Sequence, residues 1–111
     1  MNKNNRYSLL DIISYMKSRD SRDDDFCLYG ESDDTLKVDG EYYVADYPDV
    51  DDDDNEIYPQ IVQSNNLYYL YSGQQFADVI DSVLEKKPLA SLEDFVEALN
   101  YYSKHDVFFD F

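Results

Sequence analysis

The segment that most constrains this chain covers residues 46–58, with the sequence DYPDVDDDDNEIY. It contains six aspartates and one glutamate, no basic residue, and a tyrosine at or near each end. A run of like charge this dense repels itself and cannot be buried, so it must stay in water or meet a cationic partner. The rest of the chain must therefore build its core around a segment that remains at the surface.

The composition is that of a folded domain despite a net charge of −16. Hydrophobic residues make up 43% of the 111 residues, and the chain has 12 tyrosines and 6 phenylalanines. Intrinsic disorder is typical of segments with few aromatic and few hydrophobic residues, a pattern found only at residues 19–25 and 49–56. We therefore predict one domain over residues 1–111 with mobile loops at those two places.

The negative charge is concentrated in the middle third of the chain. Residues 20–56 carry 16 acidic side chains against only Arg22 and Lys37. A field of this sign repels nucleic acids and anionic membranes, and it speeds encounter with basic proteins. We therefore expect a basic protein partner and neither a nucleic-acid nor a membrane partner.

The sequence also bears on where the protein works. Cys27 is the only cysteine, so no internal disulfide can form, which suits a reducing compartment. The N-terminus, MNKNNRYSLL, has no apolar run of signal-peptide length, and no stretch approaches a transmembrane span. These features predict a soluble, unprocessed, cytoplasmic protein.

Apolar spacing and capping residues predict three helices. Residues 9–18 carry an apolar stripe that begins after the capping residue Ser8. A second helix begins after Ser72 and stops at Pro88, and a third opens after Ser91. Because the loop between the last two helices is short, we expect them to pack as an antiparallel pair.

Short β-prone runs separate the first helix from the second. Asp39-Gly40 is a strong hairpin signal, and Pro59 indicates an edge strand or a late strand start. The tail, residues 107–111, is either a last strand or a plug over the core. Strands grouped apart from helices indicate an α+β fold with an N-terminal helix, a small, mostly antiparallel sheet and a C-terminal antiparallel helix pair. The predicted strands are 26–29, 35–38, 41–47, 57–63 and 67–71.

The acidic run matches no dedicated calcium site. An EF-hand loop started at Asp49 places Asp54 where a glycine is needed, and Gln60 where the bidentate glutamate belongs. Weak, adventitious binding of divalent ions is the alternative that this spacing leaves open. We predict no bound metal and no cofactor.

No set of residues predicts catalysis. Asp51 and Asp53 satisfy a DxD pattern, as any aspartate run does, and residues 38–85 contain no Lys, Arg or His to assist them. His105, the sole histidine, is expected to help satisfy the end of the third helix. Cys27 lies between two apolar residues and is expected in the core. We therefore predict that the chain is not an enzyme, with a metal-dependent enzyme as a remote alternative.

The tyrosines have two interpretations. Adjacent tyrosines in a strand would place one ring inside and one outside, because neighbouring strand residues face opposite ways. Outward rings among carboxylates would also stack on Arg or Lys of a partner, since tyrosine is favoured at interfaces and adds cation–π contact. The adjacent pairs are Tyr42/Tyr43, Tyr68/Tyr69 and Tyr101/Tyr102.

The acidic run is likewise either a solvated loop that aids solubility or half of an electrostatically steered interface. Further acids in the flanking predicted hairpin favour the interface, because a solubility loop does not need aromatic residues interleaved on neighbouring strands. The predicted partner-binding residues are Glu41, Tyr42, Tyr43, Asp46, Tyr47, Asp49, Asp51, Asp52, Asp53, Asp54, Glu56 and Tyr58.

The last third of the chain, FADVIDSVLEKKPLASLEDFVEALNYYSKHDVFF, resembles small acidic immunity proteins of bacterial toxin–immunity systems. These include contact-dependent growth inhibition and other polymorphic toxins. The likeness lies in size, charge, a helix ending in KKP, an ASLEDFVEAL helix and a short tail after YYSKHD. It implies a cytoplasmic protein that neutralises a cognate toxin, often a basic nuclease, by covering its active site or an adjacent surface.

The expected function is therefore that of a non-enzymatic toxin inhibitor. The alternative is a DNA mimic that inhibits a nucleic-acid-binding complex, such as an anti-restriction or anti-CRISPR protein. A mimic needs acids in rows over a long face that includes the helices, and the predicted helices contribute few.

Overall fold

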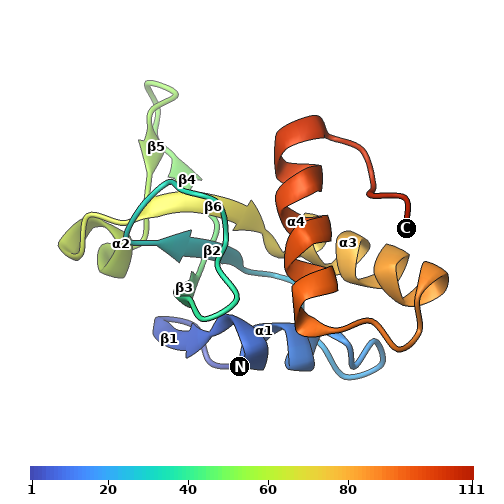
Figure 1. Cartoon of the computed structure of the whole chain (residues 1–111). Coiled ribbons are helices and arrows are strands. Elements are labelled where there is room, and N and C mark those ends of the chain that lie inside the picture. Colours follow the sequence, from blue (N-terminus) through green and yellow to red (C-terminus); the bar gives the residue numbers. More distant parts are fainter.

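The computed structural model describes residues 1–111 and contains a four-stranded antiparallel sheet, a separate two-stranded ribbon and four helices (Figure 1). This arrangement confirms the predicted α+β class. The elements are β1 (Asn5–Ser8), α1 (Leu9–Met16), β2 (Cys27–Gly30), β3 (Glu41–Ala45), β4 (Asp49–Val50), β5 (Glu56–Ile57), α2 (Gln60–Ser64), β6 (Tyr68–Ser72), α3 (Gly73–Lys86) and α4 (Leu92–His105).

The main sheet has the strand order β1-β3-β2-β6, with every pair antiparallel, so β1 and β6 form its two edges. The register between β2 and β6 shifts: Leu28 lies opposite Tyr71, but Tyr29 lies opposite Tyr69. Leu70 is therefore an extra residue, a β-bulge, and a bulge bends its strand and re-aims the side chains around it.

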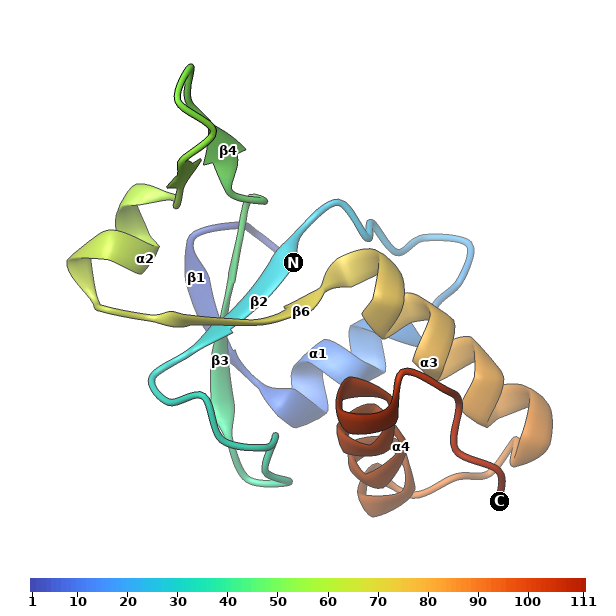
Figure 2. The same ribbon diagram turned by 90° about the horizontal axis from the view of Figure 1, so that it is seen from above.

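The sheet separates two apolar clusters. In Figure 2 helix α2 lies on the opposite side of the sheet from α1, α3 and α4. The larger cluster joins one face of the sheet to the apolar stripes of α1, α3 and α4, and the smaller one joins the other face to α2. Strand alternation produces this division, because Leu28 enters the larger cluster whereas its neighbours Cys27 and Tyr29 enter the smaller one. The helical stripes predicted from sequence therefore face the main core.

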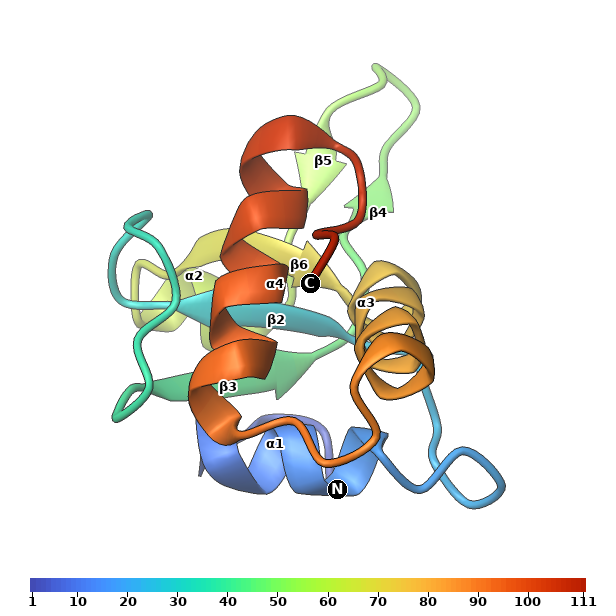
Figure 3. The ribbon, with the colours of Figure 1, turned by 45° about the vertical axis from the view of Figure 1, so that its right-hand side comes forward.

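The capping residues begin the helices as predicted. Ser72 Oγ accepts the backbone N–H of Gln75 at 3.2 Å, and Ser91 and Asp94 form a reciprocal capping box. Helices α3 and α4 pack against each other, and α4 crosses α3 rather than running along it (Figures 1 and 3). None of the helices is both long and apolar enough to cross a membrane.

The predicted strand at 35–38 and its hairpin are wrong. This segment is irregular and ends in a turn in which the Gly40 N–H donates to the Lys37 carbonyl at 2.9 Å. The side chain of Asn100 on α4 takes the place of a strand partner, because it bonds the N–H and the carbonyl of Leu36 at 2.8 and 2.9 Å. Strand β3 pairs instead with β2 and with β1, a short polar strand that the sequence did not indicate.

The predicted strand at 57–63 is also wrong beyond its first residue. Strand β5 ends at Ile57, and Pro59, with φ −53°, is the N-cap of α2. Proline suits the start of a helix because its fixed φ is already helical and its missing N–H would have no partner there. Within α2 only Val62 is buried, which gives too few apolar residues for the helix to show in the sequence pattern.

The charged segment at 19–25 is held to the body chiefly by Arg22. Further contacts come from Arg19, which lies 3.4 Å from Asp81, and from the Asp23 N–H, which donates to the Tyr15 hydroxyl at 2.6 Å. The Arg22 guanidinium pairs in bidentate fashion with the Asp81 carboxylate of α3, at 2.7 and 2.8 Å, and also donates to the Met16 carbonyl at 3.0 Å. The composition alone predicts mobility there, but this contact ties the segment to two helices.

The C-terminal tail is not a strand. Asp106, with φ 59°, ends α4, and the tail folds back so that the rings of Tyr101 and Phe109 lie 5.2 Å apart. Lys86 of α3 donates to the Phe109 carbonyl at 2.9 Å. Of the two predicted alternatives, the strand is wrong, and the plug over the core is met only by Phe109, because Val107, Phe108 and Phe111 stay exposed.

Gly73 occupies a position where a side chain does not fit. Its N–H donates to the Phe26 carbonyl at 2.7 Å, and a Cβ at Gly73 would lie 2.7 Å from that oxygen and closer still to the Asp24 carbonyl. We expect Gly73→Ala to lower the free energy of unfolding, measured in urea, by about 1–3 kcal/mol. This loss outweighs the ~1 kcal/mol that alanine gains in a helix. The exposed neighbour Gln74→Ala is the control, and stabilisation by Gly73→Ala would contradict the packing.

Candidate protein-binding surface

The acidic run forms an ordered ribbon and not an irregular loop. Strands β4 and β5 pair antiparallel, with Asp49 opposite Ile57 and Val50 opposite Glu56, and residues 51–55 connect them. The ribbon projects away from the main sheet and from the helices (Figures 1 and 2). Its carboxylates are therefore carried into solvent.

Asp51 differs from its neighbours because it builds the turn of the ribbon. Its Oδ1 accepts the N–H groups of Asp53 and Asn55, each at 2.9 Å, and its own N–H donates to the Asn55 carbonyl at 3.0 Å. These hydrogen bonds, that from Asn55 first, hold the pKa of Asp51 below its usual value. Asp54 takes a left-handed conformation with φ 62°, which aspartate tolerates better than most residues.

The ribbon has no basic partner within the chain. Its six carboxylates take part in none of the ion pairs of the structure. The other two predicted acids are engaged: Asp46 pairs with Lys3 at 2.8 Å, and Glu41 lies 3.8 Å from Arg6. The six ribbon acids are Asp49, Asp51, Asp52, Asp53, Asp54 and Glu56.

A hollow of ≈ 380 Å³ lies beside the base of the ribbon. The Tyr58 hydroxyl donates to a Glu56 carboxylate oxygen at 2.5 Å, and this hydrogen bond raises the pKa of Tyr58. The Tyr47 hydroxyl oxygen is buried and has no hydrogen-bond partner. The hollow thus combines aromatic rings with one carboxylate, a set that suits an arginine side chain. Its lining is Tyr47, Pro48, Glu56, Tyr58 and Tyr69.

Two predicted aromatic contacts turn out differently. Tyr42 is only 8% exposed and belongs to the main core, where its hydroxyl accepts the Lys37 N–H at 2.8 Å, so it cannot serve as a partner anchor. Tyr43, on the other face of β3, is half-buried beneath the Arg6 guanidinium, which lies 5.9 Å from the ring centre. The in–out alternation holds for this pair, but Arg6 already occupies the outer ring.

The in–out prediction is wrong for the other two tyrosine pairs. Tyr68 and Tyr69 are 49% and 43% exposed, because they lie on an edge strand. Tyr101 and Tyr102 lie on α4, where neighbouring residues do not face opposite ways, and both are half-buried. Tyr69 is the residue of the hollow that sequence reasoning missed, since the bulge at Leu70 decides its direction.

The remaining candidates occupy ordinary structural positions. Cys27 is fully buried, and burial raises the pKa of its thiol to about 11. His105 lies in the last turn of α4 with its ring 4.4 Å from that of Tyr101. No group of three or more His, Cys, Asp and Glu side chains is arranged to hold a metal ion.

Comparison with known protein families identifies the family of this chain. A family model described as "Domain of unknown function (DUF7716)" matches residues 8–111. The chain belongs to this family. The match includes every helix, the acidic ribbon and all of the main sheet except most of β1. Searches of curated proteins and of solved structures found no significant match.

The role of Asp51 makes it the one ribbon acid whose loss should alter the ribbon itself. We expect Asp51→Ala to speed amide hydrogen exchange at Asp53 and Asn55, and Asp52→Ala to leave it unchanged. The folded-state pKa of Asp51 is depressed because its ionised carboxylate accepts these hydrogen bonds. The stability that the carboxylate gives the turn is therefore present above the ordinary aspartate pKa of about 3.9 and is lost as pH falls through the folded value. An NMR titration in which Asp51 titrates at the ordinary aspartate pKa of about 3.9 would contradict the assignment.

Proposed function

We propose that the chain is a non-enzymatic inhibitor that binds a basic protein through the β4–β5 ribbon and the tyrosine hollow beside it. The observation that carries this proposal is the set of six ribbon carboxylates that no cation of the chain neutralises. Carboxylates held together on a projecting ribbon repel one another in the free protein. A partner rich in Lys and Arg would relieve that repulsion and would be steered toward the ribbon.

The partner class follows from the chemistry of the surface. Clustered carboxylates match the Lys and Arg that a nuclease uses to hold phosphates, and the hollow offers aromatic faces for one guanidinium. These features support an immunity protein that neutralises a toxin domain, with a basic nuclease as the target. We place this activity in the bacterial cytoplasm, where the single buried thiol of Cys27 would stay reduced.

The charge distribution favours a protein target over a DNA-mimic role. A mimic presents free acids over a long face, whereas one of the three acids on each C-terminal helix is neutralised within the chain. Asp81 of α3 is bound by Arg22, and Asp94 of α4 lies 3.0 Å from Lys87. The free acids are instead densest on the ribbon.

Capture from the native host tests the proposal. Tagged protein is incubated with lysate at low salt and eluted with a salt gradient, and the bound proteins are identified by mass spectrometry. We expect one basic protein, released at a defined salt step, whose toxicity on expression is suppressed by co-expression of this chain. Recovery of a restriction or CRISPR complex would favour the mimic, and recovery of no basic protein would contradict the proposal.

Two variants of equal charge locate the surface. The ribbon variant carries Asp49→Asn, Asp52→Asn, Asp53→Asn and Asp54→Asn, and it keeps Asp51 because that residue builds the turn. The control variant replaces four exposed acids without ion pairs elsewhere and carries Asp20→Asn, Asp78→Asn, Glu85→Gln and Glu97→Gln. Capture by the control variant, and its loss with the ribbon variant, is the expected result.

A further inference from the structure

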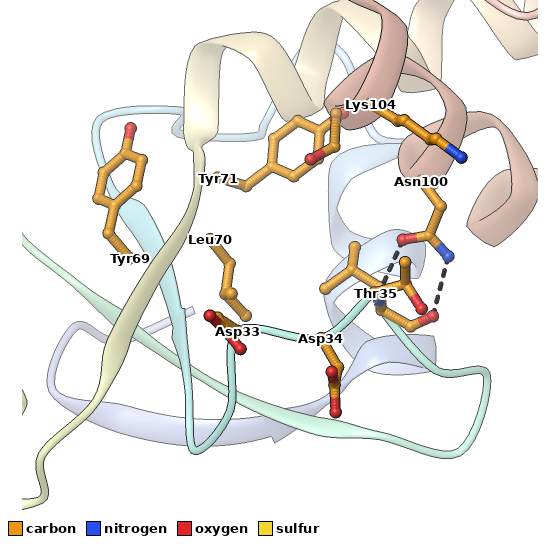
Figure 4. A pocket seen from close by; sticks show the side chains of 10 residues that line it. Asp33, Asp34, Thr35, Tyr69, Leu70, Tyr71, Asn100 and Lys104 are labelled. Atoms are coloured by element: carbon orange, nitrogen blue, oxygen red, sulfur yellow. Dashed lines mark hydrogen bonds between the residues drawn. The ribbon is translucent and has the colours of Figure 1, made fainter.

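Strand β6 leaves one side of the sheet open. It pairs with β2 on one side only, and the backbone groups of residues 68–71 make no hydrogen bond outside that pairing. In Figure 4 the yellow β6 segment runs in front of the cyan β2, with no other segment drawn along its near side. An edge of this kind is a template for a further strand.

The bulge at Leu70 gives this edge a hollow on each face. In a regular strand Tyr69 and Tyr71 would face the same way, but the extra residue turns them to opposite sides, as Figure 4 shows. On the side of Tyr69 lies the tyrosine hollow of ≈ 380 Å³. A second hollow of ≈ 260 Å³ lies between β6, the 33–36 segment and α4, where Tyr69, Leu70 and Tyr71 together form its β6 wall.

Acidic residues stand at both hollows. Glu56 lines the tyrosine hollow, and Asp33 and Asp34 line the second one, where they outnumber the single cation Lys104. Neither Asp33 nor Asp34 takes part in an ion pair of the structure. A strand with basic side chains would therefore meet opposite charge on both faces of β6.

The other edge of the sheet does not offer the same environment. Strand β1 contains Arg6, and the hollow beside it is lined by Arg6 and Lys37 as well as by acids. Lys3 lies two residues before this strand and is paired with Asp46. Arg6 lies 3.6 Å from Glu31 and 3.8 Å from Glu41, so the acids at this edge are already partly neutralised and attract a basic strand less. The net charge of −16 disfavours pairing with a second copy of this chain at either edge.

We infer that β6 accepts an extended, basic segment of the partner as an additional strand of the sheet. Backbone hydrogen bonds to residues 68–71 would provide affinity, and alternate side chains would enter the two hollows and provide specificity. An arginine fits the aromatic hollow at Glu56, and a lysine or arginine fits beside Asp33 and Asp34. This inference rests on the proposed function, because the segment belongs to the same basic partner.

Synthetic peptides test the inference without the natural partner. The first probe is an eight-residue peptide of valine and threonine with two adjacent arginines at its centre, which face opposite sides of a strand and so supply one arginine to each hollow. The second probe has the same sequence with N-methyl groups on the two arginines. The N–H groups of two adjacent strand residues point to opposite edges of the strand. The second probe therefore keeps the charge of the first but cannot pair along either edge. We expect the first probe to slow amide exchange at residues 68–71 and to bind about tenfold more tightly than the second.

Equal affinity of the two probes would overturn strand addition, as would protection at β1 or no binding of either probe. The proposed function would be unaffected, because the capture experiment decides it separately. The double variant Asp33→Asn/Asp34→Asn locates the site and is expected to weaken binding of the first probe about tenfold. Its control, Asp20→Asn/Glu97→Gln, removes the same charge outside both hollows and is expected to bind as the wild type does.

Discussion

The ribbon variant is expected to associate with the captured basic protein about ten- to a thousandfold more slowly than the wild type at low salt. The substitutions remove four of the six carboxylates that no cation of the chain neutralises, and asparagine keeps their size. Stopped-flow mixing at several ionic strengths measures the rate, and the difference from the wild type should shrink as salt screens the field.

The control variant separates the place of the charges from their number. It has the same net charge as the ribbon variant, so we expect its association rate to stay near that of the wild type. Equal slowing of both variants would mean that only the overall charge matters and that the ribbon is not the contact. The ribbon variant should stay folded, because the substitutions remove like-charge repulsion and leave Asp51 in place.

Asp81→Ala is expected to lower the free energy of unfolding by about 3 kcal/mol. The side chains of Asp81 and Arg22 are only 19% and 13% exposed, so the substitution leaves a largely buried guanidinium with the Met16 carbonyl alone. The anchored 19–25 segment should loosen at the same time. Urea unfolding measures the loss, and Asp78→Ala, an exposed change on the same helix, should cost about 0.5 kcal/mol or less.

The Arg22–Asp81 pair also predicts a pH dependence. The side-chain hydrogen bond from Arg22 holds the pKa of Asp81 below its usual value, so the carboxylate binds its proton more weakly in the folded state. Its contribution to stability is therefore complete above the unfolded-state pKa of about 3.9 and is lost as pH falls through the folded value. The stability difference between the wild type and Asp81→Ala should shrink in that range, and a constant difference would contradict the pairing.

The helices could be predicted because their signals are local. Ser72 and Ser91 cap their helices through residues three positions away, and apolar spacing marks the buried stripes. The strands depend on distant contacts. The 35–38 segment has a strand-like sequence, but Asn100, far along the chain, satisfies the backbone of Leu36. Strand β1 has a polar sequence, NRYS, and forms because β3 offers it an edge.

The candidate surface was predictable for its charge and less so for its aromatic residues. Dense carboxylates must stay in solvent wherever the chain goes, so the exposure of the ribbon follows from composition. The direction of a tyrosine depends on the register of its strand. Tyr42 therefore enters the main core although Tyr43 does not. A single extra residue, Leu70, shifts the register of β6 so that the Tyr69 side chain lines the hollow.

Mapping the partner's footprint by NMR tests the central claim most directly. The ¹⁵N-labelled chain is titrated with the captured basic protein, and changes in amide signals are followed along the sequence. We predict that the largest changes fall on residues 47–58 and on Tyr69. The amide signals of Asp20 and Glu97, which are two positions of the control variant, should not change. Changes confined to α3, α4 or the C-terminal tail would contradict the account and leave the ribbon without a role in binding.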